Sequence, residues 1–167
     1  GLMLVSNIGQ ANLESLYIVH KADDFGWPLR EGPFMLDFEG DMSKIYALPA
    51  NDSIFHFTYP AVQFDHDEGN AISGGFEYNG VKAKQLKGKY IFGDVVSGKL
   101  FFVEMKNLKD GSPSAIHQFK ASVKGKVKSL RDICGDSRVD LRFAKDSHGE
   151  IYILTKADGM IYQLRDP

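Results

Sequence analysis

The chain has 167 residues, of which 43% are apolar and 25% are charged, and this length is sufficient to bury one hydrophobic core. Its 20 Lys and Arg residues nearly balance 22 Asp and Glu residues, so the net charge of -2 excludes a strong overall field that would attract nucleic acid or an acidic membrane. No apolar stretch approaches the roughly 20 residues of a membrane span, and the single Cys134 excludes an internal disulfide.

The composition favours an all-β fold. The chain contains 17 Gly, 6 Pro, 12 Phe and 7 Tyr, a combination of turn formers and large strand formers. Only residues 12–20 have any helical character, and this segment is too short for an amphipathic stripe. The amino-terminal residues lack the basic flank and apolar length of a signal peptide, so we expect a cytosolic protein or one whose export signal has been removed.

The next segments predict strands and a hairpin. Residues 71–78 are expected to form a strand, and residues 88–103 read as two apolar runs joined by a polar turn that contains Gly98. Residues 93–99 also fit the GxxxxGK pattern of a phosphate-binding loop. Because Leu100 stands where that loop needs Ser or Thr, and a strand follows where it needs a helix, we interpret Gly98 as part of a hairpin turn.

Two later segments alternate apolar and charged residues. Residues 138–143 place Val139, Leu141 and Phe143 on one face of a predicted strand that continues to residue 145. Residues 123–128 place three lysines on one face. A basic binding patch is one interpretation, but a solvated strand edge protected against aggregation is the one that we prefer.

An internal repeat gives the organisation. Residues 88–103 align without a gap on residues 149–164, at an offset of 61 residues. Each copy is a hairpin that follows a separate strand, so we predict antiparallel propeller blades near residues 59–105 and 121–165, with residues 106–120 as a long connection. The chain supplies about three blades where closed propellers have roughly four to eight. We therefore predict one partial propeller domain over residues 1–167, whose open blade edges favour self-association.

Two acidic clusters are candidate cation sites. Residues 65–68 combine three carboxylates with His66 and could attract calcium, although a solvated loop before the strand at residue 71 is the interpretation that we prefer. Asp23 and Asp24 could also bind a cation, but a turn stabilised by side-chain hydrogen bonds requires the same residues. The remaining histidines are too scattered to form a recognisable metal set.

Several segments, in order, resemble the soluble quinoprotein glucose/sorbosone dehydrogenases. Residues 24–32 (DFGWPLREG) are similar to the family's NYGWPxxEG, and residues 59–80 are similar to its YPxxxYxH…AIxGGxxYxG. Residues 88–94 (GKYIFGD) match GxYxFGD, and residues 149–154 (GEIYIL) match the closing GELYVL. The resemblance implies a six-bladed propeller, of which this chain would be the carboxyl-terminal half.

The resemblance also implies cofactors and site residues. Family enzymes hold pyrroloquinoline quinone (PQQ) and calcium and pass a hydride from a sugar to the quinone. Carried over to this chain, the metal-bound backbone carbonyls fall at Gly9 and Gln10, and His66, Asp94 and Arg142 are the expected cofactor-binding residues. The catalytic histidine belongs to an early blade outside this sequence, so we assign no catalytic residue here. A Thr of the cofactor site is replaced near Ala61.

Two functions follow as hypotheses. The first is the carboxyl-terminal part of a PQQ-dependent, periplasmic or secreted sugar dehydrogenase that is active only in a longer chain. The second is a non-catalytic propeller that serves as a binding or scaffolding module. Neither hypothesis involves nucleic acid or a membrane span.

Overall fold

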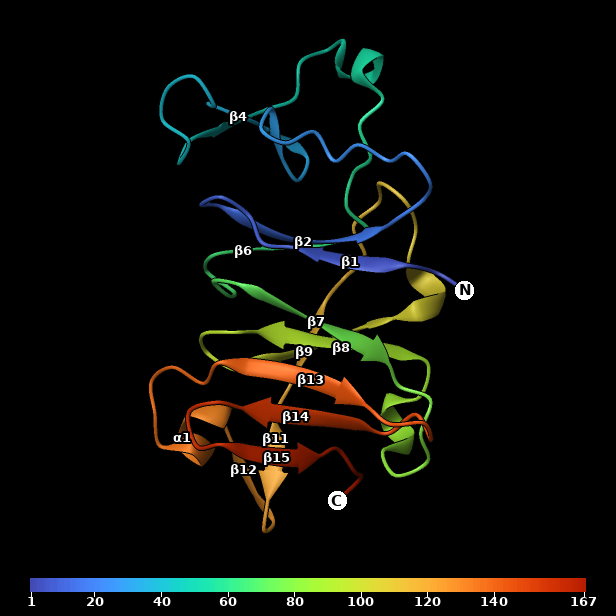
Figure 1. The fold of residues 1–167 in the computed structure, drawn as a ribbon, viewed down its shortest axis with the longest axis vertical. Coiled ribbons are helices and arrows are strands. Elements are labelled where there is room, and N and C mark those ends of the chain that lie inside the picture. The colour runs from blue at the N-terminus through green and yellow to red at the C-terminus, as the bar shows by residue number, and fades with distance from the viewer. The chain divides into compact units, whose positions relative to one another are not determined.

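Fifteen short strands and one five-residue helix dominate the computed structural model, which describes residues 1–167 (Figure 1). Three single-turn 3₁₀ helices complete the secondary structure. All of the strand pairs are antiparallel. The predicted all-β fold class, with antiparallel sheets of blade size, is therefore confirmed. No helix has the length and apolar character needed to cross a membrane.

The chain divides into two compact units, where the sequence predicts a single domain. The first unit comprises residues 1–68 and 108–114, and the second comprises residues 69–107 and 115–167. Residues 108–114 thus interrupt the sequence of the second unit and belong to the first. They join the first unit through backbone hydrogen bonds from Gly111 N to Tyr59 O (3.3 Å) and from Ser114 N to Ala61 O (2.8 Å).

The first unit contains two three-stranded sheets and one 3₁₀ turn. One sheet has the order β1-β2-β6, with β1 (Leu4–Asn7), β2 (Leu13–Ile18) and β6 (Val62–Asp65). The other has the order β3-β4-β5, with β3 (Arg30–Glu31), β4 (Phe34–Leu36) and β5 (Ile45–Tyr46), and the turn η1 (Asp52–Phe55) follows.

The helical character expected for residues 12–20 is wrong. These residues contain strand β2, which pairs with β1 on one side and β6 on the other. All six residues of β2 are buried, including Glu14 and Ser15. A central strand that is covered on both faces loses the period-two alternation by which a strand is recognised in a sequence.

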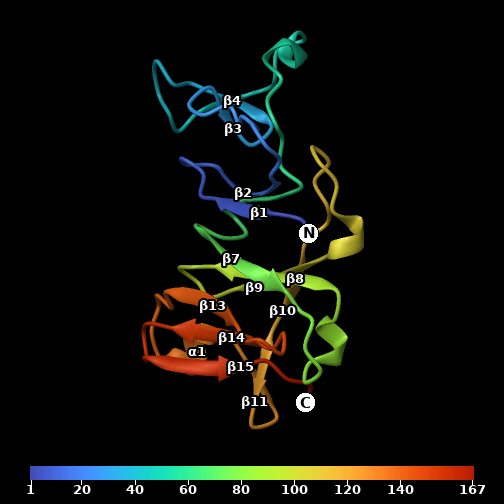
Figure 2. The ribbon, with the colours of Figure 1, turned by 45° about the vertical axis from the view of Figure 1, so that its right-hand side comes forward.

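The second unit contains a four-stranded sheet, a three-stranded sheet and a separate hairpin (Figures 1 and 2). The first has the order β10-β9-β8-β7, with β7 (Ile72–Glu77), β8 (Lys89–Asp94), β9 (Leu100–Glu104) and β10 (His117–Phe119). The second consists of β13 (Leu141–Lys145), β14 (Ile151–Thr155) and β15 (Met160–Gln163). The hairpin consists of β11 (Ala121–Val123) and β12 (Lys126–Lys128). The helical segments are η2 (Lys84–Leu86), η3 (Met105–Asn107) and α1 (Leu130–Cys134).

The hairpins predicted from the internal repeat are confirmed. Strands β8 and β9 pair antiparallel, as do β14 and β15 at the equivalent positions. Gly98 and Gly159 occupy the turns with φ of 71° and 68°, a conformation that glycine adopts without steric cost. The GxxxxGK pattern is therefore a hairpin turn, as interpreted from the sequence.

The blade boundaries differ from the predicted ones. Residues 62–65 pair with β2 in the first unit, so the blade predicted near residues 59–105 begins at Ile72. At its other end this blade gains β10, which pairs with β9 and lies within the residues predicted as a connection. Three residues of mixed polarity, His117 to Phe119, give too short a pattern to be recognised as a strand.

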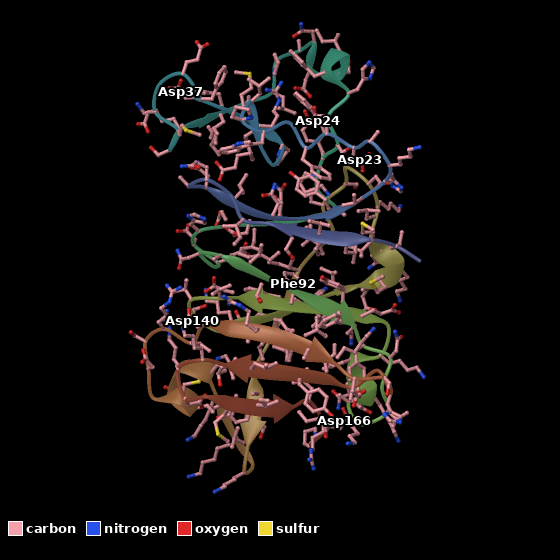
Figure 3. All side chains as sticks on the ribbon, viewed as in Figure 1. Asp23, Asp24, Asp37, Phe92, Asp140 and Asp166 are labelled. Atoms are coloured by element: carbon pink, nitrogen blue, oxygen red, sulfur yellow. The ribbon has the colours of Figure 1, made fainter.

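Two of the alternating segments contain turns that the sequence analysis did not identify. Asp140 (labelled in Figure 3) has a φ of 52°, so β13 begins only at Leu141, although Val139 is buried as predicted. Residues 123–128 form a hairpin rather than one strand, because Lys124 and Gly125 have φ of 52° and 74°. Such a pair of positive φ values is typical of a two-residue hairpin turn.

The core of the second unit lies between its two sheets. One cluster joins Tyr78 and Ile91 of the β7–β8 region to Ile151 of β14, and all three are fully buried. A second cluster surrounds Leu141 and Ile153. These contacts hold the two repeats together without a disulfide.

Candidate functional site

A shallow pocket with a cavity volume of about 20 Å³, enough for about one water molecule, lies in the first unit, where the loop before β2 meets strand β3. It includes both residues for which the resemblance implied metal-binding carbonyls, Gly9 and Gln10. Its remaining lining residues are Asn7, Ile8, Leu13, Ser15, Trp27, Arg30, Glu31 and Gly32. Trp27, the only tryptophan of the chain, is 58% exposed, so the pocket carries its own fluorescent reporter.

A buried carboxylate organises the loop on one side of this pocket. Glu31, which is 4% exposed, accepts hydrogen bonds at Oε1 from the backbone N–H groups of Ala11 (3.0 Å), Asn12 (2.8 Å) and Leu13 (3.1 Å). Its Oε2 accepts from Asn12 Nδ2 at 2.8 Å. Burial by itself would raise the pKa of Glu31, but these hydrogen bonds outweigh burial and hold the pKa below its usual value. Glu31 is thus a charged anchor of the loop.

Gly9 is required by the close packing around this carboxylate. A Cβ atom at this position would lie 1.8 Å from the carbonyl oxygen of Leu13 and 2.5 Å from Glu31 Oε1. Both distances are far below van der Waals contact, and one of the neighbours is backbone. The glycine at position 9 is therefore explained by the local fold alone.

Arg30, which precedes Glu31 in the chain, has hydrogen-bond partners of its own. Its Nε and Nη2 atoms donate to Asp52 Oδ1 at 3.0 and 2.5 Å, and Tyr59 donates its hydroxyl hydrogen to the other oxygen of Asp52. The guanidinium also lies 5.3 Å and 5.2 Å from the ring centroids of Phe55 and Phe57. Arg30 is 5% exposed, so its positive charge is not available to an anionic ligand.

Two buried oxygen atoms beside the pocket have no hydrogen-bond partner. They are Ser15 Oγ and Gln63 Oε1, whose residues are opposite each other on β2 and β6. Both lie near Gly32, at 3.5 Å and 4.0 Å from the position that its Cβ would take. Because a buried polar atom without a partner is costly, these two oxygens are the least satisfied polar groups beside the pocket.

His66 lies just beyond β6 in the same unit and contacts a buried glutamate. Its Nε2 atom is 3.2 Å from Oε1 of Glu14, whose side chain is fully buried, whereas the His66 side chain is 32% exposed. The carboxylate fixes the orientation of the ring, as a hydrogen-bonded carboxylate does for many functional histidines. Whether His66 contacts a cofactor stays a prediction.

Asp94 is the last residue of β8, in the second unit, and its carboxylate binds backbone N–H groups of neighbouring loops. Its Oδ1 accepts from the backbone N–H groups of Asn70 (2.9 Å) and Ala71 (2.8 Å), and its Oδ2 accepts from Ser97 N at 2.6 Å. Burial alone would raise its pKa, but these hydrogen bonds, with Ser97 the largest contributor, lower it. The residue is 0% exposed, so its carboxylate closes the β8–β9 turn and does not face solvent.

Arg142, in the same unit, is exposed, whereas Asp94 is buried. Its side chain is on the exposed side of β13, and Nη1 donates to the carbonyl oxygen of its neighbour Leu141 at 2.7 Å. No hydrogen bond or ion pair joins Arg142 to Asp94. The structure therefore brings Gly9 and Gln10 together in one pocket but does not connect Asp94 and Arg142 by direct contact.

The acidic clusters form turns. Asp65 Oδ1 accepts from Asp67 N at 2.9 Å, and Asp24 Oδ1 accepts from Gly26 N at 2.8 Å. Asp23, labelled with Asp24 in Figure 3, accepts from His20 N at 2.7 Å. No group of three or more His, Cys, Asp or Glu side chains is arranged to hold a metal ion.

The residues of the pocket do not fit PQQ and calcium by themselves. PQQ is an anion and needs cationic partners, but the only cation in the pocket, Arg30, is neutralised by Asp52. Calcium prefers several oxygen ligands that include carboxylates, but Glu31 is already saturated by N–H donors. We therefore derive no catalytic step through either group from this chain.

The sequence analysis missed the buried charges that build this region. Arg30 and Glu31 stand in the predicted family motif but carry no role there, and Asp52 lies outside every predicted motif. The signal that could have identified them is the adjacent Arg-Glu pair within an otherwise aromatic and glycine-rich segment, since buried charges occur almost only in pairs or networks.

Comparisons with known proteins support the fold. No family model matches the chain. The HIPL1 protein of Arabidopsis thaliana is 21% identical over 162 residues, which cover 91% of this chain and 23% of that protein. A crystal structure of a glucose dehydrogenase superposes with a TM-score of 0.64 and 17% identity over 100% of this chain and 42% of that one. The PQQ-bound aldose sugar dehydrogenase of Streptomyces coelicolor gives 0.57 and 19% over 98% and 40%.

The fold of this chain is thus similar to part of the fold of sugar dehydrogenases. The chain spans about two fifths of the length of the solved proteins and about a quarter of the plant relative. At these identities the likeness concerns architecture, and architecture alone does not determine chemistry.

Proposed function

We propose that this chain acts as the carboxyl-terminal part of a longer PQQ-dependent sugar-dehydrogenase-like protein, in which sugars are oxidised only in the full-length context. The observation that supports it best is the superposition of the whole chain on two sugar dehydrogenases, one of them with PQQ bound. The ordered sequence motifs agree with it. A periplasmic or secreted location and a requirement for calcium belong to the same proposal.

In this proposal the chain contributes scaffold and part of a cofactor surface, and other parts of the protein supply the chemistry. Hydride transfer to a quinone requires a base that removes the hydroxyl proton of the sugar, and such a base contributes typically about 10²- to 10⁴-fold to the rate. His66 is the one partly exposed histidine oriented by a buried carboxylate, but its place in the sequence matches a cofactor position of the family. We therefore expect no turnover by residues 1–167 alone.

The first experiment measures activity. The purified chain is mixed with PQQ, calcium and glucose, and reduction of a redox dye is followed beside a heat-inactivated control. The expected result is no sugar-dependent reduction above the control. Clear turnover would show that this chain contains a sufficient base and would overturn the proposal in its present form.

The second experiment separates cofactor binding from catalysis. PQQ is titrated into the chain with and without calcium while the fluorescence of Trp27 is recorded, because this exposed side chain lines the pocket. Saturable quenching together with a heat of binding in calorimetry supports a cofactor-binding part of a dehydrogenase. The same titration of a Trp27→Phe variant by calorimetry controls for optical absorption by the quinone.

A second candidate function is a non-catalytic binding or scaffolding module. The observation that favours it is the burial of Asp94 and the pairing of Arg30 with Asp52, which leave two charged groups unavailable to a cofactor. This candidate predicts no quenching and no heat with PQQ. A flat titration of the full-length protein, in which the rest of the cofactor site is present, would favour the module over the dehydrogenase.

A further inference from the structure

A basic hairpin lies between β10 and α1 in the second unit. Five Lys and Arg residues occur within residues 120–131, and no Asp or Glu occurs in residues 111–131. Because the chain has 20 Lys and Arg residues against 22 Asp and Glu residues, the part outside this segment is acidic. The basic hairpin patch consists of Lys120, Lys124, Lys126, Lys128 and Arg131.

The basic hairpin patch is exposed and unpaired. All five residues are exposed, and none takes part in an ion pair. Strands β11 and β12 pair only with each other, and Figures 1 and 2 show the hairpin extending past β15. A lone two-stranded hairpin adds little stability, and strands of three residues are already too short to need several lysines as protection against edge pairing. Neither packing nor edge protection therefore accounts for the patch.

The patch suits an anionic partner better than another part of the same protein. The hairpin lies in the interior of the sequence, so its exposure does not follow from a chain terminus. A protein segment that covered the patch would bury five cationic groups, and burial of a charge is costly unless an opposite charge is paired with it. An anionic surface that leaves the ammonium groups hydrated avoids this cost.

The residue types of the patch narrow the choice of partner. Four of its five cations are lysines, which bind phosphate as point charges and lack the planar fork by which arginine recognises a base edge. No Phe, Tyr or Trp occurs in residues 120–134, so the hairpin has no side chain on which nucleic-acid bases could stack. The patch therefore provides affinity for phosphate groups without any means of reading bases.

One apolar side chain of the hairpin points to a lipid surface. Val127 is 68% exposed and lies between Lys126 and Lys128. Successive side chains of a strand alternate, so Val127 projects from the face opposite these two lysines, while Lys124 and Gly125 form the turn at the tip. At a bilayer an apolar side chain can enter below the headgroups while lysine ammonium groups stay beside the phosphates. A soluble polyanion offers Val127 no comparable contact.

We propose that the tip of this hairpin docks on the surface of a lipid bilayer that contains anionic phospholipids. The ammonium groups contact lipid phosphates, and Val127 enters the upper part of the acyl chains. The overall charge of -2 does not oppose this contact, because at physiological salt a charge acts only over a Debye length of about 8 Å. The docking is peripheral and involves no spanning segment. This inference goes beyond the proposed function and does not depend on it.

The experiment measures co-sedimentation of the chain with vesicles of equal parts phosphatidylcholine and phosphatidylglycerol. Each lysine close to an anionic surface contributes about fivefold to binding, so the triple variant Lys124→Gln/Lys126→Gln/Lys128→Gln is expected to bind about 100-fold more weakly than wild type. The matched control is Lys21→Gln/Lys106→Gln/Lys156→Gln, which removes the same charge from three exposed lysines outside the patch and is expected to bind like wild type. Circular dichroism confirms the fold of both variants.

Variants at position 127 separate a bilayer from a soluble polyanion. Each CH₂ group that enters the bilayer contributes about fourfold to binding, so Val127→Ser is expected to bind the vesicles at least about fourfold more weakly, with unchanged binding to heparin. In Trp27→Phe/Val127→Trp the only tryptophan lies on the hairpin. Its fluorescence is expected to shift to shorter wavelength with the anionic vesicles and to stay unshifted with heparin.

Several results would overturn the proposal. If wild type fails to sediment with the anionic vesicles, or sediments equally with vesicles of phosphatidylcholine alone, the patch does not dock on anionic lipid. If both triple variants lose binding equally, general charge rather than the hairpin is responsible. Tighter binding to heparin or duplex DNA than to the vesicles, without a fluorescence shift at position 127 on the vesicles, assigns the patch to a soluble polyanion.

Discussion

Replacement of Glu31 by glutamine tests whether this buried carboxylate holds the loop before β2. Glutamine keeps one oxygen for the three backbone donors, but it presents an NH₂ group to Asn12 Nδ2, which is itself a donor. A hydrogen bond to a charged group contributes about 1.5–3 kcal/mol and a neutral one about 0.5–1.5 kcal/mol. The three bonds that lose the charge weaken together by about 3–4.5 kcal/mol, and the fourth bond, worth about 1.5–3 kcal/mol, is lost. Because removal of the charge also removes the cost of burying it, the expected net fall in the free energy of unfolding is smaller than this sum, about 3–4 kcal/mol.

The assay is urea unfolding followed by the fluorescence of Trp27, which reports on the unit that contains Glu31. Glu39→Gln is the matched control, because Glu39 is exposed, and it is expected to change stability by less than about 0.5 kcal/mol. Equal unfolding midpoints for the two variants would contradict the assigned role of Glu31.

The pH dependence gives a second, independent check of Glu31. Its pKa is lower in the folded chain than the usual 4.5, so its contribution to stability is fully present well above pH 4.5 and is lost as the pH falls through the folded-state pKa. The glutamine variant lacks this contribution at every pH. The stability difference between wild type and Glu31→Gln is therefore expected to shrink below pH 4.5, and a constant difference down to strong acid would refute the ionised carboxylate.

Three further variants test other buried contacts. Asp94→Asn is expected to lose about 2 kcal/mol of stability in denaturant unfolding followed by circular dichroism, whereas a residue that served only a cofactor would leave the apo chain unchanged. Gly9→Ala is expected to cost about 3 kcal/mol because its Cβ would overlap backbone, against about 1 kcal/mol for Gly88→Ala, which has open space and only an unfavourable φ of 74°. Tyr78→Phe removes a fully buried hydroxyl that donates to a carboxylate at 2.6 Å, and thermal unfolding is expected to show a loss of about 2 kcal/mol.

Local sequence patterns predicted the parts of the fold that depend on local interactions. The repeated hairpins were found because apolar runs and glycine turns recur at one spacing, and a tight turn needs little information from elsewhere in the chain. Strand β2 was missed because Glu14 and Ser15 are buried by tertiary contacts that no local pattern reveals. Lys124 and Asp140 adopt positive φ, which a lysine does not signal and which an aspartate adopts in only a minority of cases.

The candidate pocket was predictable only in part. Gly9 and Gln10 were placed in a site by resemblance, and both line the pocket. The loop itself, however, is held by Glu31, which is 18 residues from Leu13 in the sequence. The adjacent Arg-Glu pair can signal a buried charge, but a carboxylate that binds backbone N–H groups has no complementary residue type in the sequence, so its partners become visible only in three dimensions.

The excursion of residues 108–114 into the first unit bears on how this protein can be dissected or rearranged. Neither unit corresponds to one continuous stretch of coding sequence. A fragment that starts at Gly69 would carry this loop without Tyr59 and Ala61, the residues whose carbonyl groups bind it, and the complementary fragment would lack the loop. Cloning, domain fusion or gene recombination at residue 68 therefore damages both products, and replacing residues 108–114 by a short linker is the modification that would make the second unit separable.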